Sequence, residues 1–339
     1  MKADQAIPEH LTSNNPTEFC VERKKWGRGY RYFIDGEPIE DESFLDQLNS
    51  IAVPDTWDEV LLCSSLNNYI LAKGNDGSGN LQYLYHDDYL EYRNLQKFNE
   101  LIDFGLALPK IRRRVHKDLK RKNWDEIKLQ ALIVKILDKH YMRIGSRVYA
   151  RKNGSYGLTT LRKKHLKEKD DHIEISYVGK SGQDRRVKLT DPDLTSYIDE
   201  VSDFSGWELF SFNNGADKVR ADAESTNSYI QDISGGEFSA RNFRTWAGTV
   251  LCVANQPKAS MVIEQKPQRK LEAALVELVA EKLGNTPAIC KEYYIHPKVL
   301  KVAANEKFDP QPCDETFMKN TLYRKYECRT MELLQRFER

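Results

Sequence analysis

The first 90 residues alternate between apolar and polar positions in short runs, as antiparallel β-strands do. An apolar run at 32–34 leads into Asp35-Gly36, and Asp-Gly between such runs is a strong signal for a two-residue hairpin. A second alternation, at 81–85, follows the glycine-rich residues 74–79, which match neither a phosphate loop nor a dinucleotide fingerprint and are interpreted as a hairpin turn. The pattern predicts a small antiparallel β domain.

From about Asp88 the apolar spacing changes to three and four residues, which is typical of helices. The clearest helix is expected to begin at Asn123 as the N-cap and to stop near Tyr141. Alternating residues at 173–189 interrupt this pattern and predict a β-hairpin with Lys180 at its tip.

Further along, polar residues and prolines at 256–270 indicate a mobile connection. A helix over 271–283 should end at Gly284, because glycine is the usual residue just after a helix. Thr286-Pro287 has the signature of a new helix start.

The predicted fold class is α+β, with a small antiparallel β N-terminal domain followed by a larger, mainly α-helical domain that carries one short β-hairpin. A length of 339 residues agrees with two domains. We place them at residues 1–90 and 91–339.

Charge is balanced overall but segregated along the chain. Lys and Arg number 52 against 51 Asp and Glu, for a net charge of +1. Cations dominate between Lys110 and Lys167, whereas residues 35–59 are acidic. A dense basic surface suits phosphate binding, although charge alone fits solvated helix faces equally well.

The sequence shows no apolar run long enough to cross a membrane and no apolar stretch near Met1. Its six cysteines include no Cys-x-x-Cys pair, so neither a zinc site nor a disulfide framework is indicated. These features predict a cytoplasmic protein, associated with the nucleoid if the source is bacterial.

Several motifs follow one another in a fixed order. They are Tyr-Met-Arg-Ile-Gly at 141–145, Asn-Gly-Ser-Tyr-Gly-Leu-Thr-Thr-Leu-Arg at 153–162, Gly-Lys-Ser-Gly at 179–182, Phe-Arg-Thr-Trp-Ala-Gly-Thr at 243–249, and Gly-Asn-Thr-Pro-Ala at 284–288 with Tyr-Ile-His-Pro at 294–297. In this order and spacing the chain resembles the poxvirus-like and bacterial type IB DNA topoisomerases. Residues 29–32, 53–57 and 82–86 are similar to the cap domain of that family.

The resemblance implies a β-rich DNA cap, a helical catalytic domain of the tyrosine recombinase and type IB topoisomerase kind, and a set of site residues. Tyr294 would be the nucleophile, with Arg143, Lys180 and Arg244 as its basic partners and Asn285 as a neutral donor. The expected DNA contacts are Gln82, Tyr83, Arg112, Arg113, Arg114, Tyr156, Arg241 and Lys291. Gln82 and Tyr83 fit strand or core positions equally well, and the run 112–114 also fits a solvated face.

These residue types suit the cleavage of a phosphodiester by a tyrosine. A phenol must lose its proton to attack, and the attack leaves a covalent phosphotyrosine. Fixed guanidinium groups match the charge on the non-bridging oxygens, and Lys180 could protonate the departing 5′ oxygen. No step calls for a cofactor or a metal, and none is expected.

One geometric difficulty arises from the spacing of Asn285 and Tyr294. In a straight helix the two residues would lie roughly 12–14 Å apart along the axis. They could then meet one phosphate only through side-chain reach or an irregular helix.

The sequence departs from the family in three places. Asn80 and Leu81 replace cations of the cap, Glu292 stands close before the nucleophile, and Arg241-Asn242 replaces Lys-Asp. These changes bear on DNA affinity and sequence preference more than on the chemistry.

We therefore expect a monomeric enzyme that clamps duplex DNA, nicks one strand through a 3′-phosphotyrosyl link and reseals it, without ATP or metal. One alternative is a site-specific tyrosine recombinase, although Arg241 stands where its His-x-x-Arg motif would need histidine. The other is a DNA-binding protein with impaired catalysis.

Overall fold

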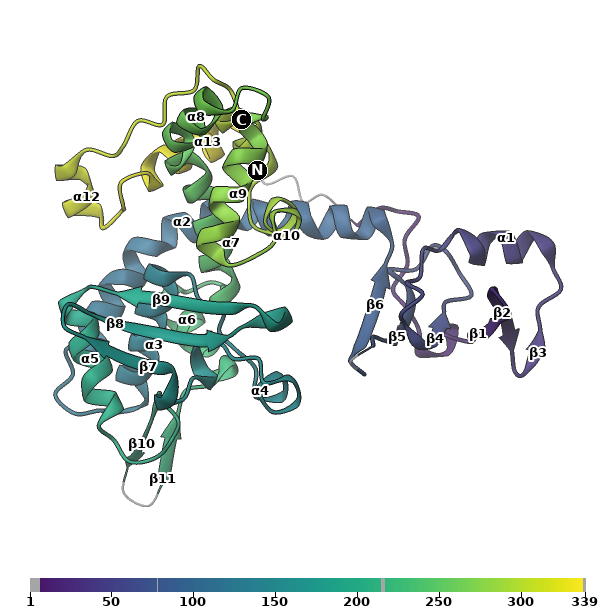
Figure 1. The fold of residues 1–339 in the computed structure, drawn as a ribbon, viewed down its shortest axis with the longest axis horizontal. Coiled ribbons are helices and arrows are strands. Elements are labelled where there is room, and N and C mark those ends of the chain that lie inside the picture. Colours follow the sequence, from purple (N-terminus) through teal and green to yellow (C-terminus); the bar gives the residue numbers. More distant parts are fainter. Residues whose placement is uncertain (1–6, 78, 215–216, 338–339) are drawn as a thin grey trace. The chain divides into compact units, whose positions relative to one another are not determined.

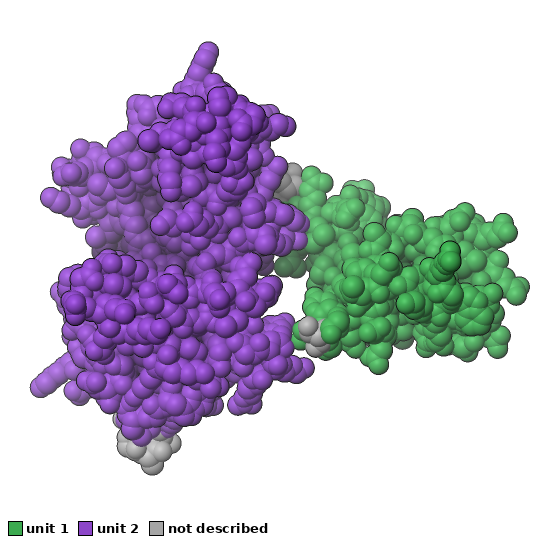
Figure 2. All heavy atoms as spheres, viewed as in Figure 1, with its two compact units in different colours: residues 1–99 green, residues 100–339 purple. Residues whose placement is uncertain are grey.

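The chain folds into two compact units, Met1–Asn99 and Glu100–Arg339, coloured separately in Figure 2. The structure is a computed structural model, and it describes residues 7–77, 79–214 and 217–337. The sequence placed the division after residue 90. Helix α2 (Asp87–Leu119) runs through that position without a break, so the change from strands to helix precedes the change of unit.

Unit 1 is built on a six-stranded sheet in the order β3-β2-β1-β4-β5-β6, and the paired neighbours are antiparallel (Figure 1). Its strands are β1 (Val21–Trp26), β2 (Gly29–Ile34), β3 (Glu37–Pro38), β4 (Asp58–Leu62), β5 (Ile70–Asn75) and β6 (Leu81–Tyr85). Asp35 and Gly36 join β2 to β3 with positive φ angles of 51° and 86°, as a two-residue hairpin requires. The predicted β domain and this hairpin are confirmed.

The strand pattern did not predict the helix that covers the core of unit 1. Helix α1 (Glu42–Ser50) is capped by Asp41, which accepts a hydrogen bond from the Phe44 backbone N–H. Its Leu48 is fully buried with Val21 and Leu62 of the sheet.

Unit 2 is mainly helical, as predicted, and Figure 1 shows its helices packed around α7 and α9 with a small sheet beside them. The remaining helices are α3 (Glu126–His140), α4 (Arg147–Asn153), α5 (Pro192–Ser202), α6 (Ala223–Ser234), α7 (Ala240–Ala254), α8 (Gln256–Gln265), α9 (Leu271–Leu283), α10 (Pro287–Tyr293), α11 (Pro297–Ala303), α12 (Glu315–Thr321) and α13 (Glu327–Phe337).

The predicted helix boundaries in unit 2 are right in part. Helix α9 ends at Gly284 with φ 60°, and Thr286 caps α10, as expected. Helix α3 begins later than predicted, because Asp125, not Asn123, accepts the Lys128 backbone N–H.

The predicted mobile connection at 256–270 is wrong over most of its length, because residues 256–265 form α8. Pro257 occupies the first turn, where a missing N–H costs nothing. Ala259 is buried in the core cluster that α8 shares with α7 and α9.

Two small sheets complete unit 2. Strands β7 (Leu166–Lys169), β8 (His172–Val178) and β9 (Asp184–Leu189) form one, and β10 (Ser211–Asn214) pairs with β11 (Asp217–Arg220) in the other. Strands β8 and β9 are the predicted hairpin, and the turn Lys180–Gly182 lies between them.

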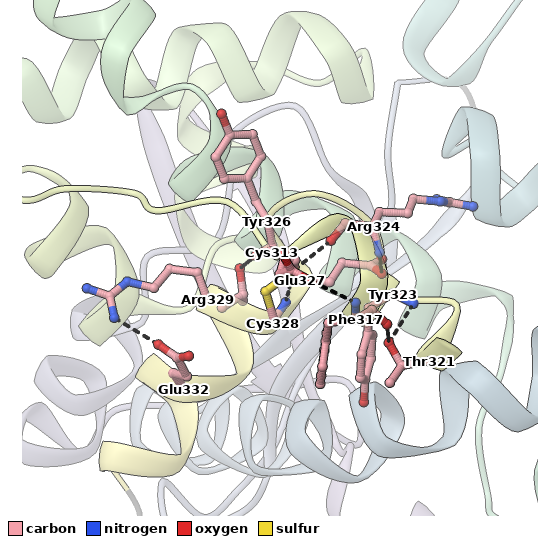
Figure 3. Close-up of a disulfide and its surroundings, with 12 residues drawn as sticks. Cys313, Phe317, Thr321, Tyr323, Arg324, Tyr326, Glu327, Cys328, Arg329 and Glu332 are labelled. Atoms are coloured by element: carbon pink, nitrogen blue, oxygen red, sulfur yellow. Dashed lines mark hydrogen bonds and ion pairs between the residues drawn. A yellow bond between two sulfur atoms is a disulfide. The ribbon is translucent and has the colours of Figure 1, made fainter. Parts of the chain in front are cut away.

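The structure pairs Cys313 with Cys328 in a disulfide, shown in Figure 3. This corrects the expectation that no disulfide would form: the pair spans 15 residues without a recognisable motif, and folding alone brings the two Cα atoms to 5.8 Å. Within the described residues, no helix combines the length and the apolar character that crossing a membrane requires.

Candidate active site

Arg143 reaches the site because helix α3 ends abruptly. Tyr141 adopts the left-handed conformation at the end of α3, with φ 55°, and turns the chain away from the helix axis. The Arg143 guanidinium then donates to the Gly284 carbonyl at 3.2 Å and to the Asn285 side-chain oxygen. Gly157 supports this turn, because a Cβ there would collide with the backbone of Gly145.

Arg244 enters the same site from the buried face of α7 and is only 4% exposed. Its Nη1 donates to the carbonyl of Tyr141, and its Nη2 donates to the carbonyl of Leu283 at 3.1 Å. Nη2 also lies 3.3 Å from Oδ1 of Asn285. Arg244 therefore joins the end of α3 to the end of α9.

Asn285 stands between the two arginines. Its backbone N–H bonds back to the Ala280 carbonyl, which holds the residue against the end of α9. Its Oδ1 accepts from both Arg143 and Arg244. Its Nδ2 and the Nε of Arg244 are buried donors with no acceptor among the described residues, and such orphaned donors are rare in folded proteins.

Tyr294 lies on the other side of Arg244, whose guanidinium carbon is 4.9 Å from the centre of the Tyr294 ring. Helix α10 ends at Tyr293, so the chain leaves the helix at Tyr294 with φ −126°. Arg244 thus touches both Asn285 and Tyr294. A straight helix would separate Asn285 from Tyr294. Here the helix ends before Tyr294, and Arg244 of α7 contacts both residues.

Helix α7 also fixes the backbone of Tyr294. A Cβ on Gly248 would meet the Tyr294 carbonyl group, so only glycine allows this approach. The hydroxyl of Thr249 lies 3.5 Å from the Tyr294 carbonyl oxygen and accepts the backbone N–H of His296 at 3.1 Å. The motif at 243–249 therefore supplies both a cation and a platform for the tyrosine.

The environments of the two adjacent tyrosines push their pKa values apart. Burial alone would raise the pKa of Tyr294, but the charge and hydrogen bond of Arg244, with Arg143 and Arg241, lower it below its ordinary value. At Tyr293 a hydrogen bond to Glu292, together with burial, raises the pKa to about 12. Of the two phenols, Tyr294 is the one prepared to lose a proton.

The positive charge of the site is not neutralised by any carboxylate that the structure describes. Among the described residues, no carboxylate forms an ion pair with Arg143 or Arg244, and their acceptors are carbonyl and amide oxygens and, for Arg244, the Tyr294 hydroxyl. Burial, and for Arg143 also the neighbouring charge of Arg244, lowers the pKa of both groups. The site is therefore arranged to receive an anion.

Lys180 stands apart from this cluster, exposed on the turn between β8 and β9. In the described part of the chain, Lys180 takes part in none of the hydrogen bonds that connect Arg143, Arg244 and Asn285.

Arg185 is a site residue that the sequence did not indicate. It pairs with Tyr177 across the β8–β9 hairpin, and a Cβ on Gly284 would meet its guanidinium group. Its charge contributes to the lowered pKa of Arg143 and Arg244. Gly284 was a possible signal for this contact, since only glycine leaves room for the Arg185 guanidinium. In the sequence, however, its position at the end of a helix was already a sufficient reason for a glycine.

Three of the expected DNA contacts lie on unit 2 surfaces. Tyr156 lines a cavity of about 350 Å³ together with several cations, one carboxylate and an exposed indole, which include Arg147, Arg151, Arg162, Trp207, Glu208, Lys218 and Arg220. Arg241 is exposed on α7. Lys291 is exposed on α10 and forms an ion pair with Glu272 at 2.7 Å.

The expected contacts of unit 1 lie on strand β6. Tyr83 is 44% exposed, so it is available to a partner. Gln82 is half-buried and donates to the Asp76 carboxylate at 2.7 Å.

The basic run at 112–114 divides among three environments. Arg113 is exposed, whereas Arg114 pairs with Asp118 at 2.8 Å. Arg112 faces the interior and pairs with Asp138 and Glu327, which corrects its expected role as a DNA contact. A guanidinium enclosed by two carboxylates is not available to a phosphate.

The arginine site lacks the histidine and carboxylate ligands that metals prefer. In the described residues, one group that could hold a metal ion brings together His10, His86 and Asp88, all of unit 1. Cys290 lies near the site, but burial raises its pKa to about 12, which disfavours the thiolate that would bind metal or react.

Residues 87–311 match the family described as eukaryotic DNA topoisomerase I, catalytic core. The DNA topoisomerase 1B of Acanthamoeba polyphaga mimivirus is 27% identical over 284 residues, which cover 81% of this chain and 84% of that protein. The DNA topoisomerase 1B of vaccinia virus (strain Copenhagen) is 23% identical over 300 residues, covering 82% and 90%.

Among solved structures, the XerH site-specific recombinase bound to difH substrate is similar to 56% of this chain and 49% of its own, about half its length. The TM-score is 0.34 and the identity 15%.

Proposed function

We propose a mechanism for this chain from the geometry of its arginine site. The chain belongs to the family of type IB DNA topoisomerases, whose catalytic core it matches over residues 87–311. The chain relaxes supercoiled duplex DNA by cutting and resealing one strand. Tyr294 is the nucleophile, and Arg143, Arg244 and Asn285 bind the scissile phosphate.

One observation carries this proposal: the buried Arg244 and the partly buried Arg143 share a site with orphaned donors, and no carboxylate of the described residues pairs with either arginine. Burying a charge is costly unless it is paired, so the folded protein keeps a cost that only an anionic partner removes. A phosphodiester supplies the missing charge and acceptors for Asn285 Nδ2 and Arg244 Nε. Neighbouring Arg185 adds to the same positive field.

The chemistry follows from the position of Tyr294. Its hydroxyl loses a proton, helped by the lowered pKa, and its oxygen attacks phosphorus while the bond to the 5′ oxygen breaks. The arginines and Asn285 stabilise the charge that gathers on the non-bridging oxygens. The new phosphotyrosyl bond replaces the one that broke, and the reverse attack by the 5′ hydroxyl restores the strand.

We assign the proton for the departing 5′ oxygen to Lys180. Its exposed position on the β8–β9 turn leaves the ammonium group open to a duplex laid across the site. Lys180 therefore belongs to a part of the site that DNA completes.

We further propose that the enzyme acts as a monomer and that unit 1 contributes DNA contacts of its own through Tyr83. On unit 2 the cavity around Tyr156 joins aromatic rings to cations, a combination that suits a phosphate backbone. Arg113, Arg241 and Lys291 are the exposed cations available to neighbouring phosphates. Such an enzyme would work in the cytoplasm, at the nucleoid in a bacterium.

Plasmid relaxation in EDTA without ATP tests the activity. We expect the wild-type protein to relax negatively supercoiled plasmid and Tyr294→Phe to be inactive, because the nucleophilic oxygen is gone. Tyr293→Phe is the matched control and should retain activity within about twofold. Failure of the wild type to relax DNA, or undiminished relaxation by Tyr294→Phe, would refute the proposal.

A nicked suicide oligonucleotide separates this enzyme from a DNA-binding protein with impaired catalysis. After cleavage the short fragment that carries the 5′ hydroxyl dissociates, and the phosphotyrosyl adduct is trapped. A covalent adduct mapped to Tyr294 supports the proposal, whereas binding without any adduct favours the inactive alternative.

A further inference from the structure

The residues beyond 311 lie outside the family match, and the structure describes residues 312–337 as part of unit 2. Helices α12 and α13 belong to this segment, and the disulfide joins Cys313, ahead of α12, to Cys328 in the first turn of α13 (Figure 3). The segment is thus closed on itself around Glu327, the residue next to Cys328.

Glu327 is a buried carboxylate that is only 2% exposed. Its side chain accepts hydrogen bonds from α2, from α7 and from the backbone just before α13. Its two oxygens accept from the two terminal nitrogens of Arg112, at 2.7 and 2.8 Å. One oxygen also accepts the indole N–H of Trp246 at 3.0 Å, and the other accepts the backbone N–H of Arg324 at 2.7 Å. A bidentate pair of this kind fixes both orientation and distance.

The first path from Glu327 to the catalytic site runs along α7. Trp246 lies two residues after Arg244 on the same helix. The packing around it is tight, because a Cβ on Gly105 of α2 would meet both the Trp246 ring and the sulfur of Met331 on α13. A shift of Glu327 therefore moves α7 and, with it, Arg244.

The second path runs through Arg112 to the end of α3. Arg112 binds Asp138 with Nε at 3.0 Å and Nη2 at 2.9 Å. Asp138 lies in the last turn of α3, just before Tyr141, whose carbonyl accepts Arg244 and whose left-handed turn delivers Arg143. Both catalytic arginines are thereby connected to one carboxylate.

The disulfide keeps that carboxylate in place. The backbone N–H of Cys313 donates to the Lys325 carbonyl at 2.5 Å, and the backbone N–H of Cys328 lies 3.2 Å from the sulfur of Cys313. A dithiol reductant would convert the disulfide to two thiols by giving up two electrons and two protons, and would itself become a cyclic disulfide. Reduction then leaves residues 314–327 without their covalent closure.

We propose that Glu327 is a positioning residue for Arg143 and Arg244, and that the Cys313–Cys328 disulfide holds it in place, so that reduction of the disulfide slows DNA cleavage. This rests on the proposed function. A reducing cytoplasm keeps most thiols reduced, which makes the pair a point at which the oxidation state of the cell acts on the enzyme.

Single-turnover cleavage of a suicide oligonucleotide at saturating DNA tests the role of Glu327. Glu327→Gln keeps the size and an acceptor but loses the charge that holds Arg112, and we expect cleavage to slow by about tenfold or more, because small misplacements of catalytic groups are costly. The dissociation constant for DNA should stay within about twofold, since no DNA contact is removed. Glu332→Gln is the matched control, because Glu332 lies on the same helix in an exposed pair with Arg329.

The pH profile distinguishes positioning from a loss of stability. If Arg244 moves away from Tyr294, the pH at which cleavage reaches its plateau should rise in Glu327→Gln, whereas a less stable but correctly arranged site keeps the wild-type profile. Hydrogen exchange without DNA gives a second readout, with faster exchange expected at 138–145 and 240–254. Cleavage by Glu327→Gln within twofold of wild type, with an unchanged profile, overturns the positioning role.

The disulfide is tested with oxidised and reduced wild-type protein, its state confirmed by counting free thiols. Reduction should slow cleavage several-fold, and the double variant Cys313→Ser/Cys328→Ser should cleave at the reduced rate and no longer respond to the reductant. Equal rates for oxidised and reduced wild type, or a failure of the native protein to form this disulfide under air, overturn the redox part. If wild-type protein forms no adduct at all, the proposed function has failed, whereas the hydrogen-exchange comparison still decides whether Glu327 holds α7.

Discussion

Two groups of arginines in unit 2 point into the protein, and they differ in what neutralises their charge. Arg112 donates to the carboxylates of Asp138 and Glu327 and, through Nη1, to the backbone carbonyl of Leu322 at 2.6 Å. Arg143 and Arg244 face carbonyl and amide oxygens instead. The first cluster is complete within the protein, whereas the second is completed only by an anion.

The difference is visible in the pKa values of the arginines. Burial disfavours the charged form of Arg112, but Asp138 and Glu327 outweigh it and raise the pKa above its ordinary value. At Arg244 burial lowers the pKa, and no carboxylate of the described residues reverses the shift. The ion pairs of Arg112 therefore contribute to the stability of the fold, whereas the unpaired charge of Arg244 is available to bind an anion.

The largest effect should come from removing a charge of the unneutralised cluster. We expect Arg244→Ala to lower single-turnover cleavage on the order of 10²–10³-fold, because a charge that stabilises the transition state is lost. The free energy of unfolding should change by no more than about 1 kcal/mol, since the lost hydrogen bonds are offset by relief of burial and of repulsion from Arg143. Urea unfolding measures this, and a large destabilisation would contradict the comparison.

The neutralised cluster should respond in the opposite way. Arg112→Leu leaves two buried carboxylates without their partner, and we expect a loss of about 3–5 kcal/mol in the free energy of unfolding. Arg113→Leu, one position along the same helix but exposed, is the control and should change stability by about 0.5 kcal/mol or less. Similar urea midpoints for the two variants would show that Arg112 is not neutralised as described.

Acid pH should weaken the neutralised cluster through its neighbour His140. Burial, then the charges of Lys139 and Arg324, lower the pKa of His140 from 6.5 to about 4. Between these values the unfolded chain binds the extra proton, so stability is lost as pH falls from 6.5 toward 4. His296, with a pKa lowered by burial to about 4, adds to the same slope. His140→Gln should flatten the slope of unfolding free energy against pH in part.

Alkaline pH should act on the other cluster, with the smallest effect of the four. The lowered pKa of Tyr294 means that cleavage should rise with pH and level off below 10, the ordinary value for a phenol. Arg241 lowers this pKa from an exposed position, so Arg241→Ala should move the plateau slightly upward. A rate measured by single-turnover cleavage that does not change with pH would mean that proton loss is not part of the measured step. Tyr293→Phe should leave the profile as it is.

The basic run at 112–114 shows what a charge pattern leaves open. Consecutive residues of a helix point about 100° apart, so three adjacent arginines cannot share one surface. Arg112 lies four residues after Leu108 and three before Val115, both buried, and this spacing places it on the inward face of α2. Helical periodicity thus gave a signal for its burial, but its partner Glu327 lies 215 residues away and no local pattern indicates it.

The connection at 256–270 and the disulfide were missed for related reasons. Pro257 was interpreted as a break in the chain, but it lies in the first turn of α8. Only the burial of Ala259 against its neighbours distinguishes a helix start from a loop at this position. The two cysteines are ordinary in the sequence because their approach depends on the path of residues 314–327.

The sequence by itself determined the β character of unit 1 with its Asp35-Gly36 hairpin, the β8–β9 hairpin, the end of α9 and the start of α10. It also determined the order of motifs that contains Arg143, Arg244, Asn285 and Tyr294. These features depend on period, capping and turn chemistry, all of which act over a few residues. Only the tertiary structure decided that Arg244 touches both Asn285 and Tyr294, that Arg185 joins them, and that Arg112 is neutralised by carboxylates. The physical reason is that burial and counterions belong to the packed chain, where a charge meets partners from distant segments.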